Sequence, residues 1–340
     1  MPTSNHAEGP TPGLFFQTAN AYQRTEALKA AVELDLFTAI GEGKDTAPAL
    51  AQRCGAAERG VRMLADYLTI QGFVTKEGTR YKLTTDSAMF LDRRSPAYMG
   101  SVLGFLLAPK FTDAFQNLRE AVRKGGTVSG EAGTVEPEHP LWIEFAKSMM
   151  PMMAKAAEEI AQFVKETQPK VKKVLDIAAG HGLFGVDIAK RCPQVEIVAL
   201  DWANVLTVAQ DLARQAGIQD RYRTIAGDAF REDFGEGYDL VLLTNFLHHF
   251  SPAQCETLLR KVHRSLVPSG RVITLEFVPN EDRVTPPMVA EFGLIMLATT
   301  PEGDAYTLKE YQEMFRAAGF SKVEQRPLPG SMEQVLVSSK

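Results

Sequence analysis

The chain of 340 residues carries 37 Lys and Arg against 42 Asp and Glu, for a formal net charge of −5. This length suffices for one large domain or two ordinary ones, and the slight acidity argues against a nucleic-acid or anionic-membrane partner. No apolar stretch approaches the roughly 20 residues of a membrane-spanning helix, and the polar N-terminus lacks a secretory signal pattern. The three cysteines are scattered without metal-ligand spacing, so we expect a cytoplasmic protein with reduced thiols and no metal.

The first part of the sequence predicts helices followed by a short β ribbon. Apolar residues recur at helical spacing in residues 19–40 and 56–72, with a shorter helix between them. The stretch FVTKEGTRYKLT then alternates apolar and polar residues around Glu-Gly, which predicts a hairpin. Three helices and a hairpin in this order are typical of a winged helix, which we assign to residues 1–105.

Residues 106–165 are expected to be a helical linker, interrupted by the flexible stretch KGGTVSGEAGTVEPEHP. The pattern changes in residues 166–340, where apolar strands alternate with amphipathic helices. The predicted strands are VKKVLDIA, VEIVALD, RYRTIAGD, YDLVLLTNFL and RVITLEFV. This alternation predicts a doubly wound, Rossmann-like α/β domain with a parallel sheet. Ligands of such domains bind beyond the carboxyl ends of the strands.

A glycine-rich turn follows the first predicted strand. The segment GHGLFG matches the dinucleotide-binding fingerprint, and a nicotinamide dehydrogenase is a possibility that rests on this motif alone. Asp176 lies on the strand just before Gly180 and Gly182, where dinucleotide enzymes usually carry apolar residues. A carboxylate at this position suits the ammonium group of an amino acid moiety.

Two further acidic residues end the next strands. Asp201 is placed to accept hydrogen bonds from ribose hydroxyls, and Asp228 suits the amine of adenine, with Trp202 or Phe230 for packing. Each acid could instead cap the following helix. A ligand with an ammonium group, ribose and adenine but no phosphate is S-adenosylmethionine. The predicted cofactor-binding residues are Asp176, Gly180, Gly182, Asp201, Trp202, Asp228, Ala229 and Phe230.

These motifs together resemble a known family. The runs VLDIAAGHG, LDWANVL, AGDAF, NFLHHFS and LVPSGRVITLEF are similar to the class I S-adenosylmethionine-dependent O-methyltransferases related to caffeic acid and acetylserotonin O-methyltransferases. The resemblance covers nearly the whole chain and implies a homodimer formed through the N-terminal domain, with S-adenosylhomocysteine as product. Ala178 and Ala179 replace two glycines of the family's usual turn.

The resemblance also implies a general base. The segment LHHFSPAQC aligns without a gap with a family segment like CHDWSDEHC, so His248 falls on the base and Glu276 on the carboxylate that orients it. His249 falls where the plant enzymes carry Asp, and Ala305 replaces a second family Glu. Neighbouring side chains of a strand point to opposite faces, so we expect His249 to turn away, and a zinc site lacks further ligands.

Two apolar segments resemble the family's acceptor pocket. They contribute Phe145 and Met149 from FAKSM, and Phe292 and Met296 from FGLIM, although ordinary core packing has the same spacing. The expected reaction is methylation of a hydroxyl on a small aromatic metabolite. Methylation of N, S or C, and use of the cofactor without methyl transfer, remain alternatives. A winged-helix regulator that binds DNA and senses S-adenosylmethionine is a further alternative. Helix 56–72 mixes acidic and basic residues, which argues against DNA binding.

Overall fold

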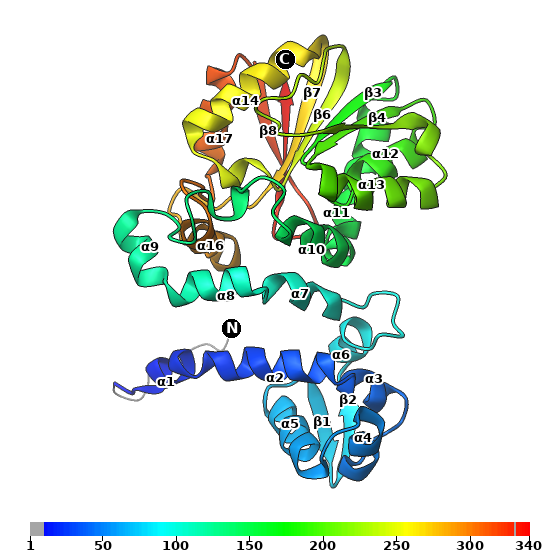
Figure 1. The fold of residues 1–340 in the computed structure, drawn as a ribbon, viewed down its shortest axis with the longest axis vertical. Coiled ribbons are helices and arrows are strands. Elements are labelled where there is room, and N and C mark those ends of the chain that lie inside the picture. The colour runs from blue at the N-terminus through cyan, green and yellow to red at the C-terminus, as the bar shows by residue number, and fades with distance from the viewer. Residues whose placement is uncertain (1–9, 330) are drawn as a thin grey trace. The chain divides into compact units, whose positions relative to one another are not determined.

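The computed structural model describes residues 10–329 and 331–340. The chain divides into two compact units, the first ending at Leu103 and the second running from Gly104 to Lys340 (Figure 1). The first unit is mainly helical. Its elements are α1 (Gly13–Ala19), α2 (Ala21–Glu33), α3 (Leu36–Gly41), α4 (Ala47–Cys54), α5 (Glu58–Ile70), β1 (Val74–Glu77), β2 (Arg80–Leu83), α6 (Thr85–Phe90) and the 3₁₀ turn η1 (Gly100–Val102).

The helices and the hairpin predicted for the first unit are present, but α1, α6 and η1 were not predicted, and one predicted helix is divided. The helix expected over residues 19–40 is broken at Asp35, which adopts a left-handed conformation with φ 57° and separates α2 from α3. The apolar face of α5 packs with the hairpin in one buried cluster that includes Val61, Leu68 and Val74. Burial of this face holds the unit together independently of the second one.

The second unit is built on a seven-stranded sheet with the order β5-β4-β3-β6-β7-β9-β8. Neighbours from β5 to β7 pair in parallel, whereas β9 runs antiparallel to both β7 and β8. The expected doubly wound, Rossmann-like sheet is thereby confirmed. Its strands are β3 (Lys173–Ile177), β4 (Glu196–Asp201), β5 (Tyr222–Ala226), β6 (Tyr238–Thr244), β7 (Leu266–Glu276), β8 (Lys322–Pro327) and β9 (Gln334–Ser339).

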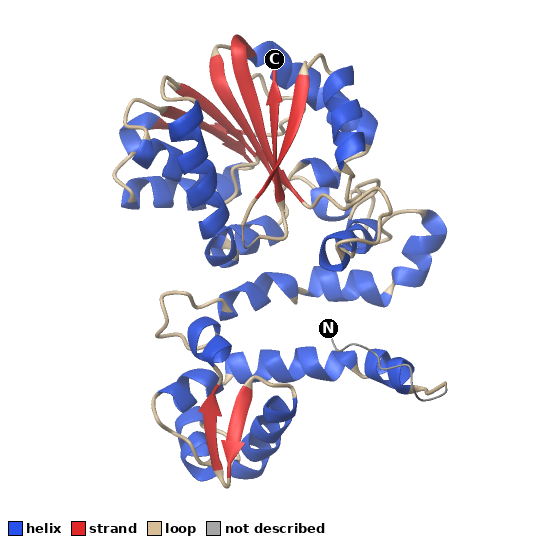
Figure 2. Ribbon diagram, turned by 180° about the vertical axis from the view of Figure 1, so that it is seen from behind, coloured by secondary structure: helices blue, strands red, loops and turns tan. Residues whose placement is uncertain are grey.

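Helices cover both faces of this sheet (Figure 2). The helices α11 (Met150–Thr167), α12 (Leu183–Arg191) and α13 (Ala203–Gln215) lie on one face, and α14 (Pro252–Ser265) and α17 (Leu308–Ala317) on the other. Both α14 and α17 begin with a capping box, formed by Ser251 with Gln254 and by Thr307 with Glu310. In each box, the side chain of one residue accepts a hydrogen bond from the backbone N–H of the other. The remaining elements are α7 (Leu103–Leu106), α8 (Pro109–Gln116), α9 (Leu118–Lys124), α10 (Leu141–Ser148), α15 (Pro287–Ala290), α16 (Phe292–Thr299), and the 3₁₀ turns η2 (Gly133–Val135), η3 (Gln219–Arg221) and η4 (Leu247–His249).

Two parts of the sheet differ from the sequence-based expectation. The predicted strand RVITLEFV covers only part of β7, which starts earlier, at Leu266, includes the sequence LVPSG and shifts register against β6 near Tyr238. The strands β8 and β9 were missed. Most residues of β8 are polar and exposed because it lies at the sheet edge, so it carries little of the apolar pattern by which a buried strand is predicted. Among the described residues, no helix has the length and apolarity needed to cross a membrane.

Candidate active site

A cavity of about 1060 Å³ lies in the second unit, at the carboxyl ends of the parallel strands. This volume is at the upper end of the range for small-molecule sites, roughly 300–1,000 Å³, and therefore leaves room for two ligands. Most of its lining residues are apolar, and many of these are Phe, Trp or Met. Of the residues predicted for the site, the lining includes Phe145, Met149, Gly180, Asp201, Trp202, Asp228, Ala229, Phe230, His248, Phe292 and Met296.

The turn after β3 is tied to the end of β4 by Asp201. The parallel pairing of β3 with β4 places Ile177 beside Leu200, so both strands end at the same edge. The backbone N–H of Gly180 donates to Asp201 Oδ2 at 2.8 Å, and that of Trp202 donates to Oδ1 at 2.7 Å. Burial raises the pKa of Asp201 to about 6, although these two N–H groups oppose the shift. Each carboxylate oxygen keeps a further lone pair for a ligand hydroxyl.

Asp176 and Gly182 do not belong to the cavity lining. Asp176 is fully buried, and within the described residues neither carboxyl oxygen has a hydrogen-bond partner. Burial raises its pKa to about 7. This placement gives no support to the expected contact between Asp176 and an ammonium group, because the side chain is enclosed within the protein. Burial could not be anticipated from sequence position, since acids at strand ends are usually solvated.

Gly182 has a packing role instead. It adopts φ 75°, and a Cβ atom there would lie 2.8 Å from the Ala209 side chain and 2.7 Å from Tyr222 Oη. Only glycine allows α12 to start this close to α13.

Asp228 follows Gly227 just beyond the end of β5, next to the end of β4 at Asp201, and lines the cavity. Its Oδ1 accepts a hydrogen bond of 2.9 Å from the backbone N–H of Phe230, which fixes the turn after β5. The Phe230 ring packs against Phe250 in an edge-to-face arrangement with centroids 4.8 Å apart. A carboxylate and aromatic rings thus border the same part of the cavity as Trp202.

His248 and Glu276 are brought together by the pairing of β6 with β7, which places Thr244 beside Leu275. Glu276 is fully buried. Its Oε1 accepts the backbone N–H groups of Phe246 at 3.1 Å and Leu247 at 2.8 Å, while Oε2 forms a short hydrogen bond with His248 Nδ1. The carboxylate therefore holds both the turn and the imidazole ring, and a proton on Nδ1 leaves Nε2 as a proton acceptor.

Burial opposes a charge on either member of this pair. It lowers the pKa of His248 to about 3 and raises the pKa of Glu276 to about 8, against the opposing effect of backbone N–H groups. The two groups share one hydrogen bond and therefore titrate as a unit. His248 is consequently neutral at neutral pH, as a proton acceptor must be.

The expectation that His249 turns away is wrong. Strand β6 ends at Thr244, Asn245 adopts a left-handed φ of 53°, and residues 247–249 form η4. Successive side chains of a 3₁₀ turn are about 120° apart rather than on opposite faces. Both His248 and His249 consequently line the cavity, with ring centroids 4.3 Å apart.

Aromatic contacts organise two parts of the cavity wall. Phe145 meets Phe105 and Trp142 edge to face, with centroids 5.0 Å and 5.8 Å apart, and lies beside the turn at Gly180. Phe292 stacks on Phe277 at 4.1 Å and meets the His248 ring edge to face at 4.8 Å. These rings give the wall on both sides an apolar, aromatic character. Trp142 and Phe277 were missed because nothing in a single sequence separates pocket aromatics from core aromatics.

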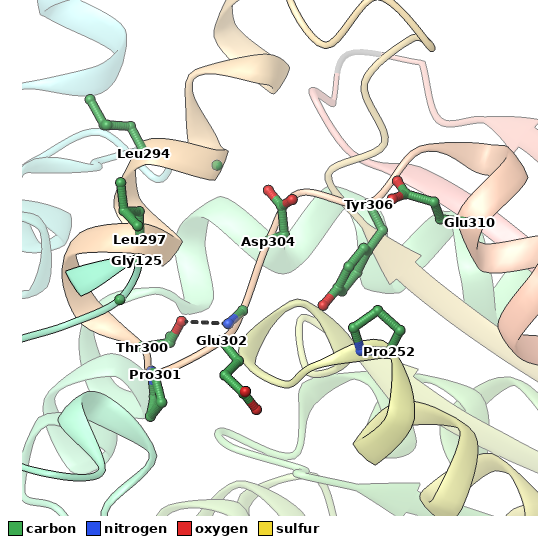
Figure 3. A pocket seen from close by; sticks show the side chains of 13 residues that line it. Gly125, Pro252, Leu294, Leu297, Thr300, Pro301, Glu302, Asp304, Tyr306 and Glu310 are labelled. Atoms are coloured by element: carbon green, nitrogen blue, oxygen red, sulfur yellow. Dashed lines mark hydrogen bonds between the residues drawn. The ribbon is translucent and has the colours of Figure 1, made fainter. Parts of the chain in front are cut away.

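Ala305 is buried and is not part of the cavity wall. Within residues 10–329 and 331–340, no group of three or more His, Cys, Asp or Glu side chains has the arrangement of a metal site. A second cavity of about 510 Å³ is lined by α16, the loop after it and Tyr306 (Figure 3). Thr300 Oγ1 there accepts the Gly303 backbone N–H at 2.9 Å, and Pro301 and Glu302 line both cavities.

Comparison with solved structures first gives the fold. Human N-acetylserotonin methyltransferase, solved in complex with S-adenosylmethionine, superposes with a TM-score of 0.83 over 99% of each chain at 21% identity. The two chains therefore share one fold, including the Rossmann-like sheet of the second unit. The sequence of the O-methyltransferase domain matches residues 111–321, and that of the O-methyltransferase dimerisation domain matches residues 16–93. The chain therefore belongs to the O-methyltransferase family.

Two further relatives extend over nearly the whole chain. A crystal structure from Nostoc punctiforme, whose name carries a provisional O-methyltransferase assignment, is 55% identical with a TM-score of 0.96 and covers 98% of this chain and 100% of its own. The 3-hydroxy-5-methyl-1-naphthoate 3-O-methyltransferase of Streptomyces sahachiroi is 27% identical over 318 residues, or 92% of this chain and 90% of that protein.

Proposed function

We propose that this enzyme transfers the methyl group of S-adenosylmethionine to a hydroxyl of a small aromatic metabolite, with His248 as general base. The observation that carries the proposal is His248 on the wall of a cavity that also holds the turn at Gly180 and Asp201, with its Nδ1 hydrogen-bonded to the buried Glu276. The solved human relative holds S-adenosylmethionine, and the Streptomyces relative is named for methylation of a naphthoate hydroxyl.

The residues at the cofactor end fit this group. The carboxylate of Asp201 lies on the cavity wall with one backbone donor on each oxygen, so it can accept ribose hydroxyls. Asp228, Ala229 and Phe230 offer a carboxylate, a small side chain and a ring to adenine. When bound, S-adenosylmethionine supplies a methyl group on a sulfonium, which needs no metal ion for its transfer.

The protein's own part in the reaction is alignment and proton removal. A phenol has a pKa of about 10, near that of Tyr, so complete ionisation before attack is unfavourable at neutral pH. His248 Nε2 accepts the hydroxyl proton while the oxygen attacks, and Glu276 stabilises the charge that develops on the imidazole. The apolar side chains of Phe145, Phe292 and Met296 line the cavity and can hold the acceptor ring in place, and positioning can supply several kcal/mol of the rate enhancement.

The test is a mass-detected methyl-transfer screen over phenols, indoles, thiols and amines. We expect turnover of phenols, and a decrease in kcat on the order of 10²–10⁴-fold in His248→Ala, with S-adenosylhomocysteine affinity by calorimetry almost unchanged. His263→Ala is the matched control, since this histidine packs on Phe320 outside the cavity lining.

Near-normal turnover by His248→Ala would remove His248 from the role of base. Methylation restricted to indoles, thiols or amines would favour the N-, S- or C-methyltransferase alternatives. Binding of S-adenosylmethionine without methylation of any acceptor would favour a reaction that uses the cofactor without methyl transfer. We also propose that the enzyme is a homodimer formed through its first unit, which matches the family's dimerisation domain.

A further inference from the structure

We propose that His249 forms a hydrogen bond with a second oxygen on the acceptor, on the ring position next to the hydroxyl that receives the methyl group. The inference rests on the proposed function and narrows its acceptor to an aromatic hydroxyl flanked by another oxygen. It is carried by the position of the His249 ring and by the hydrogen bonds around it.

His249 stands directly beside the proposed base. The two imidazole rings have centroids 4.3 Å apart and planes tilted by 57°, and both line the same cavity. The Trp142 ring meets His249 edge to face at 5.2 Å and supports it from the acceptor side. A planar ligand that presents a hydroxyl to His248 therefore presents its neighbouring substituent to His249.

The two histidines differ in what holds them. Nδ1 of His248 is bound by Glu276, which commits its Nε2 to accepting a proton. The His249 ring makes no hydrogen bond to the rest of the described chain, and its buried Nδ1 has no partner. No protein group fixes its tautomer, so the ring can either donate to a ligand or accept from one.

Three other polar side chains that line the cavity already have partners. Thr134 Oγ1 donates to the carbonyl oxygen of Thr299 at 3.1 Å, and Thr299 Oγ1 donates to that of Ile295 at 2.7 Å. Trp142 Nε1 donates to the carbonyl oxygen of Thr134 at 2.9 Å. His249 is thus the uncommitted member of this group, and it is the one beside the base.

The environment keeps His249 neutral. Burial lowers its pKa well below the ordinary value, and the neighbouring His248 lowers it further. A neutral imidazole can donate to a carbonyl oxygen or accept from a hydroxyl, whereas a carboxylate at this position only accepts. The acceptor class is therefore an arene in which the reacting hydroxyl stands next to a second hydroxyl or a carbonyl group.

The experiment compares matched acceptors with and without the second oxygen. The probes are 2,3-dihydroxynaphthalene against 2-naphthol, and 1-hydroxy-2-acetonaphthone against 1-naphthol. The readout is the ratio of kcat/KM within each pair, compared between the wild type and His249→Phe, so that the intrinsic reactivity of each probe cancels. We expect the substitution to reduce the preference for the flanked member roughly 10- to 100-fold, as loss of a hydrogen bond from a buried ligand group implies.

Two conservative variants distinguish the ring atoms. The amide of His249→Gln reaches the position of Nε2, which faces the ligand in this proposal, whereas that of His249→Asn reaches the position of Nδ1. We expect Gln to retain much of the preference and Asn to lose it. Calorimetric binding of S-adenosylhomocysteine and the Tm of each variant control for misfolding.

The inference fails if the preference ratios of His249→Phe equal those of the wild type, or if the wild type prefers the unflanked members after correction for their reactivity. Either result requires turnover, so it leaves the proposed function standing. Absence of methyl transfer to every probe and to the wider screen would instead overturn the proposed function.

Discussion

At the scale of single residues, burial shifts the pKa values of both proposed catalytic groups, His248 and Glu276. Burial holds the pKa of Glu276 at about 8, well above its ordinary value, and the hydrogen bond to His248 couples the two titrations. Below this pH the pair carries one additional proton. That proton takes up the lone pair with which His248 would otherwise accept the hydroxyl proton. The active form therefore becomes more populated as pH rises, and its population decreases as pH falls.

The corresponding prediction concerns the pH dependence of kcat/KM for a phenolic acceptor. In the wild type it should rise from about pH 7, reach half its plateau near pH 8 and level off above about pH 9, because the pair loses its proton around a pKa of about 8. Glu276→Gln has no carboxyl to titrate, so this limb should disappear and kcat should fall on the order of 10²-fold. If the variant keeps the same limb, ionisation of another group, such as the acceptor, causes it.

At the scale of elements, the site depends on how each strand ends. After β6 the chain turns into η4 rather than continuing as a strand, and this brings His249 to the same wall as His248. After β3 the chain turns through Gly180 and Gly182 into α12, whose start lies against α13. Gly180, in this turn, lines the proposed cofactor-binding end of the cavity. Because the turn leads directly into α12, the packing of α12 on α13 sets the position of Gly180.

Gly182→Ala tests this packing, with Gly217→Ala as a control. Both glycines have a left-handed φ, 75° and 69°, but a Cβ atom at Gly217 would meet nothing within 4 Å. The two variants share the backbone strain, whereas only Gly182→Ala forces overlap with Ala209 and Tyr222. We expect it to be less stable than the control by about 1–3 kcal/mol in urea unfolding and to bind S-adenosylhomocysteine more weakly. Equal stability and equal affinity of the two variants would contradict this view of the turn.

At the scale of the whole molecule, the first unit exposes apolar surface that its own core does not use. No residue of α1 is buried, and Leu14, Phe15 and Phe16 are 77%, 68% and 56% exposed. Tyr22 on α2 is also exposed. Contiguous exposed apolar surface of this kind marks an interaction site, and the match to the dimerisation domain indicates a second copy of the chain as the partner.

We therefore expect the protein to sediment as a dimer, and the double substitution Phe15→Ser with Phe16→Ser to shift it toward the monomer. Loss of two large apolar side chains from an interface weakens association by several kcal/mol at most, so the shift should depend on protein concentration. Ile70→Ser on α5, also at an exposed apolar residue, is the control. A wild-type monomer, or a double variant that remains dimeric at micromolar concentration, would contradict the assignment.

Local sequence patterns were sufficient to predict the parallel sheet, the winged-helix elements and the acids at strand ends, because apolar periodicity and turn residues act over a few neighbouring positions. The resemblance to the family, rather than local patterns, implied the pairing of His248 with Glu276, and the sheet brings the two residues into contact at the ends of β6 and β7. Three features depended on contacts between distant segments: the burial of Asp176, the role of Gly182 against Ala209, and the edge strand β8. The direction of the His249 side chain depends on where β6 ends. Because the chain forms a 3₁₀ turn there instead of continuing as a strand, neighbouring side chains are about 120° apart and do not point to opposite faces.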